Sequence, residues 1–295
     1  MSSNLDNQID VAVQNNAFAT YERVSTVTSG TSANSFGTAV SSRVPSWARA
    51  LLAITIVSVD QTTTAAQGKN GILRLNLSDL GISNQEFSVG PYVTSSPATN
   101  NSGQSNVVKI IPMDIQCGGN ENLEIDIAPT GSSTVGTLSE IGLLYANKPE
   151  FLPPAFMNKI GLGLLPLRGG KVESAQQLTT QRTALTGIDA PSWARAIVGC
   201  QGLILKNGAI TAGQECLGYF QMSNTLGITP FSFPTSFGSG GTLGTPTGTG
   251  QYANEIPYLP CFIPLPSSVQ TFTPQVLLTT AVSTGNRAVA SLVWR

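Results

Sequence analysis

The sequence predicts an all-β fold built from two tandem copies of one domain. Three observations predict it: a seven-residue segment with six identical positions occurs twice about half a chain apart, the apolar segments are short, and helical periodicity is weak over most of the 295 residues. A chain of this length also exceeds what one hydrophobic core usually organises. We therefore expect two similar cores, one in each copy.

The repeated segment is the most informative feature. Val44-Pro-Ser-Trp-Ala-Arg-Ala50 returns as Ala190-Pro-Ser-Trp-Ala-Arg-Ala196, 146 positions later. The same offset places Leu80-Gly81-Ile82 on Leu226-Gly227-Ile228. Two matches in one register indicate duplication of a whole domain, because a repeat of this length is large enough to have its own core.

The repeat also gives the domain boundaries. Near the ends of the copies, Leu143-Leu144-Tyr145 corresponds to Leu292-Val293-Trp294 at an offset of 149, a drift that small loop insertions explain. We expect an N-terminal extension with a helix-compatible pattern over Asn4–Ala19, and a Pro-rich linker whose prolines disfavour regular structure. The predicted units are the extension 1–16, the first domain 17–148, the linker 149–160 and the second domain 161–295.

Six apolar segments of the first copy are predicted strands, and Gly, Asn, Ser or Pro separate them: 47–59, 72–77, 87–93, 107–115, 123–127 and 141–145. In one of them Leu123, Ile125 and Ile127 alternate with Glu124 and Asp126, which predicts a strand with one solvated face.

The segment from Trp47 to Val57 is apolar on both faces. Perfect alternation would put Trp47, Leu51 and Val57 on one face and Leu52, Ile54 and Ile56 on the other. We therefore expect this strand to be central in its sheet, or covered by a neighbouring barrel.

Short strands with long polar loops fit a β-sandwich or jelly roll better than a helical or βαβ fold. The pattern alone does not separate a jelly roll from an immunoglobulin-like or other sandwich. Each copy has its longest polar insertion between corresponding strands, at Thr94–Asn106 and at Pro234–Asn254, so both insertions are expected at the same end.

Composition favours a protein that buries much of its surface in an assembly. Charged residues make up 11% of the chain, against about 25% in ordinary soluble domains, so the surface is polar but mostly uncharged. Lys and Arg number 15 against 16 Asp and Glu, without a basic run, so direct nucleic-acid binding is not expected. Neither a signal peptide nor a membrane-spanning segment is expected.

The chain contains no histidine, which removes His-based triads, general bases and metal ligands. We therefore expect no enzymatic activity, no catalytic residues and no cofactor. Asp114, Glu121, Glu124 and Asp126 are close in sequence and offer calcium ligands, but they lack calcium-loop spacing, and a solvated strand face is the favoured interpretation.

The four cysteines are widely spaced and are expected to be buried free thiols, with a bridge between Cys200 and Cys216 left open: Cys117, Cys200, Cys216 and Cys261. The candidate site residues are the structural anchors of the two repeats: Pro45, Trp47, Arg49, Pro191, Trp193 and Arg195. Each Trp and Arg has two interpretations, an assembly contact or a strand start in which Trp packs and the Arg stem covers apolar surface. The structural interpretation is favoured, and on it either Trp→Ala variant costs about 3–5 kcal/mol.

Two similar β-barrels with an N-terminal extension and elaborated loops at one end resemble the double jelly-roll major capsid proteins of tailless, membrane-containing icosahedral phages and adenovirus-like viruses. The resemblance covers nearly the whole chain in architecture but rests on no family-specific motif. It implies two tandem eight-stranded jelly-roll β-barrels, and a homotrimer whose six barrels form a pseudo-hexagonal capsomer of an icosahedral shell. The virion capsid, assembled in the host cytoplasm, is the implied location.

The resemblance also implies the partners. The chain is expected to bind itself and neighbouring capsomers, with residues 1–17 inside the shell near other capsid proteins or an internal viral membrane, and with the long loops facing outward. The main alternative is a phage spike or lectin-like protein that binds a receptor or glycan through tandem β-sandwich domains. A carboxylate-based glycosidase is a third class. It needs two acidic residues about 5–9.5 Å apart in a cleft, and the sequence does not locate such a pair.

Overall fold

The computed structural model confirms that the chain is predominantly β. It describes residues 2–28, 32–37, 40–60, 69–94, 105–106, 108–129, 137–158, 168–174, 183–185, 187–207, 218–223, 232–234, 236–240, 259–265, 271–278 and 287–295. Strands fill most of these ranges. The helical elements among them are α1 (Ser2–Gln14), η1 (Ser78–Leu80), η2 (Pro149–Phe151) and α2 (Pro154–Met157).

Nineteen strands lie in the described part of the chain. Those of the first half are β1 (Ala19–Thr28), β2 (Val40–Arg43), β3 (Ala50–Asp60), β4 (Lys69–Leu77), β5 (Ile82–Thr94), β6 (Ser105–Asn106), β7 (Lys109–Gln116), β8 (Asn122–Pro129) and β9 (Thr137–Ala146). Those of the second half are β10 (Arg168–Ser174), β11 (Thr183–Ala184), β12 (Ile188–Asp189), β13 (Ala196–Asn207), β14 (Gly218–Ser223), β15 (Ser232–Pro234), β16 (Ser236–Gly240), β17 (Leu259–Pro264), β18 (Thr271–Leu278) and β19 (Arg287–Trp294). Each of the six segments predicted as strands contains a strand, although 47–49 belongs to the turn before β3 and residue 107 lies outside the described residues.

The strands of each half form two groups of four neighbours. In the first half the orders are β1-β9-β3-β7 and β2-β8-β4-β5. In the second half they are β10-β19-β13-β17 and β11-β18-β14-β15, with β12 also paired to β18. The two halves therefore repeat the same strand order in the same chain order, as a duplication requires.

The pairing register places equivalent residues in equivalent positions. Leu51 of β3 pairs with Tyr145 of β9, and Ile197 of β13 pairs with Trp294 of β19. Leu51 and Ile197 are 146 positions apart, and Tyr145 and Trp294 are 149 positions apart. These are the two offsets found in the sequence repeat. In each half the two strand groups are also connected by a parallel pairing. β3 pairs in parallel with the end of β5 in the first half, and β13 pairs in parallel with β16 in the second half.

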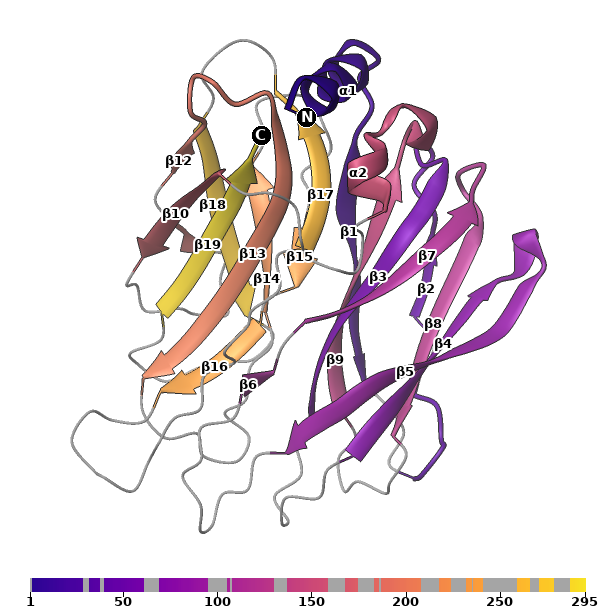
Figure 1. The fold of residues 1–295 in the computed structure, drawn as a ribbon. Coiled ribbons are helices and arrows are strands. Elements are labelled where there is room, and N and C mark those ends of the chain that lie inside the picture. The colour runs from indigo at the N-terminus through magenta and orange to yellow at the C-terminus, as the bar shows by residue number, and fades with distance from the viewer. Residues whose placement is uncertain are drawn as a thin grey trace.

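The halves lie side by side, with the first in indigo to magenta and the second in orange to yellow (Figure 1). Hydrogen bonding makes one path of 14 strands across them, but the link is narrow. Ala19 of β1 pairs with Phe262 of β17, and β6 pairs with β16 over two residues. Parts of the two long polar insertions therefore meet, whereas the rest of both insertions lies outside the described residues.

A β-bulge between Leu51 and Ala53 corrects the predicted faces of β3. Leu51, Ile54 and Ile56 belong to one buried cluster with residues of β4 and β8, inside the first half. Leu52, Ala53 and Val57 belong to a second cluster that continues into the other half. Both faces of β3 are apolar, as predicted. Because of the bulge, however, Ile54 and Ile56 lie on the same face as Leu51, and Val57 lies on the same face as Leu52.

We expected two separate cores, one in each half, but the buried residues are not divided in this way. One cluster fills the first half, and the other joins the interior of the second half to the outer face of β1, β9 and β3, to α1 and to the linker. The prolines of the linker start the short helices η2 and α2, a position that proline favours, so the linker is ordered over 149–158. Its side chains Leu152 and Phe156 are buried. The domain boundaries themselves stay a prediction.

Candidate functional site

The two Pro-Ser-Trp-Ala-Arg segments fold into equivalent turns. The Ala48 amide donates to the Pro45 carbonyl at 2.9 Å, and the Ala194 amide donates to the Pro191 carbonyl at 2.9 Å. In each turn the proline carbonyl accepts from the residue three positions later, which is the usual hydrogen bond of a β-turn. The turns precede β3 and β13, the central strands of their groups.

The arginine backbone joins each turn to the ends of the two neighbouring strands. The Arg49 amide donates to the Ala146 carbonyl at 2.7 Å, and the Cys117 amide donates to the Arg49 carbonyl at 2.8 Å. In the second half Arg195 has the same role, because its amide donates to the Arg295 carbonyl at 2.6 Å and its carbonyl accepts from Leu265 at 2.8 Å. The repeated motif thus fixes where β9 and β7, or β19 and β17, end beside the central strand.

The side chains of the two turns have diverged. The ring of Trp47 is half-buried, with its centroid 5.0 Å from that of Phe18 and 6.3 Å from that of Tyr145 in an edge-on contact. Trp193 is 46% exposed. The two tryptophans therefore differ in exposure, and their role as structural anchors stays a prediction.

The two arginines also bind different partners. Arg49 Nη1 donates to the carbonyls of Ser46, Ala48 and Gly118 at 2.8–3.1 Å, so its guanidinium closes its own turn. Arg195 instead forms an ion pair with Asp10 on α1, and a second pair joins Arg295 to Asp6 of α1 at 3.4 Å.

Helix α1 is held against the second half by apolar packing as well as by these ion pairs. Ile9 and Ala12 are buried, and Leu5 packs at the edge of the same cluster. A cavity of about 20 Å³ between α1, α2, β13 and β17 has room for about one water molecule. Its lining residues are Leu5, Ile9, Pro153, Ala155, Phe156, Val198, Phe262 and Arg295. The cavity is a packing gap beneath the helix, too small for a ligand.

Gly119 lies against the first turn and was not singled out by the sequence. Its φ is +87°, and a Cβ there would lie 2.6 Å from the Ser46 carbonyl oxygen. Replacing Gly119 by Ala is expected to lower the free energy of unfolding by about 1–3 kcal/mol, because backbone strain and a backbone clash coincide. Urea unfolding followed by circular dichroism measures it.

Gly81 provides the matched control for that variant. Its φ is +71°, but a Cβ would meet no atom within 4 Å. Gly81→Ala should therefore cost only the conformational strain, about 1 kcal/mol. Equal losses in the two variants would contradict the close approach of Gly119 to the turn.

A buried ion pair lies at the junction of the halves. Glu140 on β9 is fully buried, and Arg23 on β1 binds both of its carboxylate oxygens, with Nη2 3.3 Å from Oε2. The Arg23 guanidinium also lies 3.9 Å from the ring centroid of Tyr219 on β14, in the second half. One cation thus joins three strands across the junction.

A buried tyrosine and two buried thiols share the same junction. Tyr21, Cys200 and Cys261 are fully buried, and no residue of the described chain bonds the Tyr21 hydroxyl. Burial raises the pKa of Tyr21 well above its usual value, and the two thiols raise it further. Cys117, Cys200 and Cys261 are free thiols, as predicted for these three, and Cys216 lies outside the described residues.

The four acidic residues considered for calcium do not form a site. Asp114 is exposed on β7, Glu121 accepts the Gly118 amide, and Glu124 is exposed on β8. Asp126 is 9% exposed, and burial raises its pKa while Arg74 lowers it. No three His, Cys, Asp or Glu side chains of the described ranges gather to hold a metal ion.

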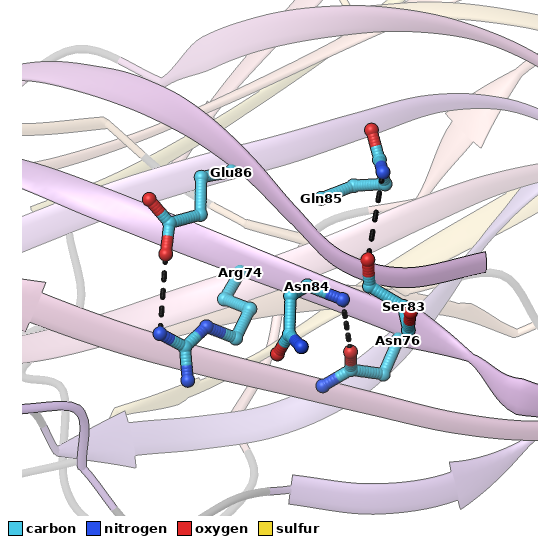
Figure 2. A network of polar contacts seen from close by, with 6 residues as sticks. All are labelled: Arg74, Asn76, Ser83, Asn84, Gln85 and Glu86. Atoms are coloured by element: carbon cyan, nitrogen blue, oxygen red, sulfur yellow. Dashed lines mark hydrogen bonds and ion pairs between the residues drawn. The ribbon is translucent and has the colours of Figure 1, made fainter.

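The outer face of β4 and β5 carries a polar network. Arg74 binds Glu86 at 3.1 Å, and the Asn84 amide donates to Asn76 Oδ1 at 2.6 Å (Figure 2). The network ties two neighbouring strands together, and the carboxylate of Glu86 is 47% exposed. It is a solvated strand face.

No protein-family model and no curated protein matches the sequence. A recombinant peptide:N-glycanase F aligns with 95% of this chain and 96% of its own, at 9% identity and a TM-score of 0.26. A chain described by the triple jelly roll fold and turret assembly of an archaeal virus aligns over 94% of this chain and 58% of its own, at 11% identity and a TM-score of 0.21. VP2 of an infectious bursal disease virus subviral particle aligns over 94% and 71%, at 9% identity and a TM-score of 0.23. Scores of this size favour none of these proteins as a guide to function.

No helix in the described part of the chain is both long and apolar enough to cross a bilayer.

Proposed function

We propose that this protein is a major capsid protein whose two halves are tandem eight-stranded jelly-roll barrels. The observation that carries the proposal is the repeated strand order. If the eight main strands of a half are lettered B to I along the chain, its two groups have the orders BIDG and CHEF, which is the jelly-roll arrangement. The second half has the same orders, with the letter C shared by β11 and β12, which both pair with β18.

The way the halves pack also supports a shell-building role. They share a buried cluster, and the Arg23 guanidinium of the first half lies over the Tyr219 ring of the second half, so the chain presents two similar barrels packed against each other. A tile with pseudo-sixfold symmetry needs two such barrels per chain and three chains. Charged residues make up only 11% of the chain, and such a low fraction suits surfaces that become buried between subunits.

Residues 1–17 are proposed to contact neighbouring capsomers, other capsid proteins or an internal membrane. The apolar side chains Ile9 and Ala12 already pack against the second half, so such a contact would use the outer face of α1, where Val11 is 45% exposed. The proposed location is the virion, and the proposed role requires no catalysis.

A glycan-binding spike is the second candidate, and one observation favours it. Trp193 is 46% exposed at the end of the second half, and an exposed indole is a usual platform for sugar rings. A glycan array read with labelled protein tests it: binding that Trp193→Ala abolishes would support the spike and count against the capsid proposal.

The capsid proposal is tested by the assembly state of the purified chain. Light scattering after gel filtration should give three times the chain mass of 30.8 kDa, and electron microscopy should show tiles with hexagonal outlines. A stable monomer at micromolar concentration would contradict the proposal, because an obligate capsomer interface holds at that concentration.

A further inference from the structure

We propose that residues 32–37 form a pH-sensitive strap over Asp126, closed while this carboxyl group carries a proton and loosened when it is ionised. The strap lies in the first half, beside β8. The inference goes beyond the proposed function and does not depend on it, because every group involved belongs to one half of one chain.

The strap is held at the edge of β8 by two backbone hydrogen bonds. The Asn34 amide donates to the Pro129 carbonyl at 2.8 Å, and the Gly37 amide donates to the Ile127 carbonyl at 2.9 Å. Strand β2 follows the strap in the chain and pairs along the same strand. The strap and β2 therefore flank β8 on one side, and β4 flanks it on the other.

One side chain of the strap reaches across β8. The ring centroid of Phe36 lies 3.4 Å from the guanidinium carbon of Arg74, which belongs to β4 on the far side of β8. Arg74 is paired in register with Asp126 of β8, so both side chains lie on the face opposite the buried cluster. Phe36 and Arg74 thus meet over the outer face of β8 at the level of Asp126.

This contact leaves the Asp126 carboxylate in an unfavourable place. Asp126 is 9% exposed, and its Oδ1 atom accepts no hydrogen bond from the described chain. The Arg74 guanidinium binds Glu86 on β5 at 3.1 Å instead, as Figure 2 shows. A buried carboxylate without its hydrogen bonds costs free energy when it is ionised, and much less when it is protonated.

The charges nearest to Asp126 do not remove this cost. Burial raises the pKa of Asp126, the Arg74 cation lowers it, and the Glu124 carboxylate, two positions away on β8, raises it. The net result is a raised pKa, so burial outweighs the attraction of the cation. The closed strap therefore favours the protonated form of Asp126.

The other elements that adjoin β8 carry their charges far from Asp126. The strap contains no titratable side chain. Arg43 of β2 pairs with Asn122, and Asp79 of η1 accepts hydrogen bonds from Asn122. Asn122 is four positions from Asp126 on β8, which is about 13 Å along an extended strand.

The strap and the carboxyl group are linked through the proton. When the strap opens, water reaches Asp126 and its pKa returns toward the ordinary value of about 3.9. The closed form therefore binds the proton more tightly than the open form, so protonation favours closing and ionisation favours opening. Closure is strongest below the ordinary pKa and weakens as the pH rises through the raised pKa of Asp126.

Amide exchange in the full chain tests the strap. Hydrogen–deuterium exchange at Asn34 and Gly37, measured by mass spectrometry with fragmentation, follows the opening of the two hydrogen bonds. Wild type and Asp126→Asn are compared at equal pH, which cancels the intrinsic pH dependence of exchange. At neutral pH the variant should exchange at least about fivefold more slowly, because its neutral side chain is cheaper to bury. The ratio of the two rates should fall toward one as the pH decreases to about 4.

Asp114→Asn is the matched control, because Asp114 is an exposed aspartate on β7, in the other strand group, and exchange of the strap should be unchanged in it. Circular dichroism verifies the folding of each chain. Equal rates in wild type and Asp126→Asn at neutral pH would overturn the proposal, as would a rate ratio that stays constant over the pH series. Faster exchange in Asp126→Asn would also overturn it, because the ionised carboxylate would then hold the strap.

Discussion

Replacing Glu140 by Ala is expected to lower the free energy of unfolding by about 3–5 kcal/mol. Glu140 is fully buried, and its two oxygens bind Arg23 in a bidentate pair. Without the carboxylate the Arg23 cation, whose side chain is 28% exposed, loses its bidentate partner and keeps its contact with the Tyr219 ring. The cost comes from that uncompensated charge more than from the lost attraction.

The exposed pair of Arg74 and Glu86 is the matched control. Its atoms are 3.1 Å apart, but the Glu86 side chain is 47% exposed, so Glu86→Ala should cost no more than about 1 kcal/mol. Denaturant unfolding at one fixed protein concentration measures both variants. A loss at Glu140 no larger than at Glu86 would show that water reaches the junction and screens the pair.

The second large effect is expected at Trp294. Trp294 is 1% exposed, and its ring centroid lies 5.8 Å from that of Phe272 inside the second half. Trp294→Ala should lower the free energy of unfolding by about 3–5 kcal/mol through lost burial and the cavity left behind.

The other two tryptophans should complete a graded series. Trp193→Ala should cost less than about 1 kcal/mol, since the side chain is 46% exposed, and half-buried Trp47 should fall between. Thermal and denaturant unfolding of the three variants gives the order. Equal losses at Trp47 and Trp193 would instead support the original expectation that both anchor their turns alike.

The sequence was sufficient to locate the strands with strong apolar patterns and the duplicated turn. Leu123, Ile125 and Ile127 are buried as their alternation predicts. The strand β1 was missed, because Ala19–Thr28 mixes charged and hydroxyl side chains with few apolar ones. Its strand character comes from pairing with β9, which is more than a hundred residues away in the chain.

The register of the fourth strand of each half shows where a sequence repeat misleads. The constant offset of 146 equates Phe220 with Arg74. Phe220 is fully buried, whereas Arg74 points to the solvated face and pairs with Glu86. A shift of one residue equates Phe220 with Leu73 instead, because in a strand one position separates the core from solvent. The segments around Leu80 and Leu226 do not test this offset, since 226–228 lies outside the described residues.

The junction of the halves was beyond sequence reasoning. The pair of Arg23 and Glu140 joins residues 117 positions apart, and neither residue stands out in a local pattern. The bulge in β3 did have a signal. Pro112 on β7 pairs with Ala53, and Pro260 on β17 pairs with Gly199, both at a bulge. Proline in a strand marks an edge or a bulge, so these two prolines were the available clue.

The shared bulge limits how the halves can be re-engineered. Downstream of it, Ile54 and Ile56 pack inside the first half, whereas Val57 belongs to the cluster that continues into the neighbouring half. Deleting one residue between Leu51 and Ala53 would turn Ile54 and Ile56 outward and force Val57 inward. A chimera that transplants a central strand from one half to the other must therefore carry the bulge together with the edge proline opposite it, as a single cassette.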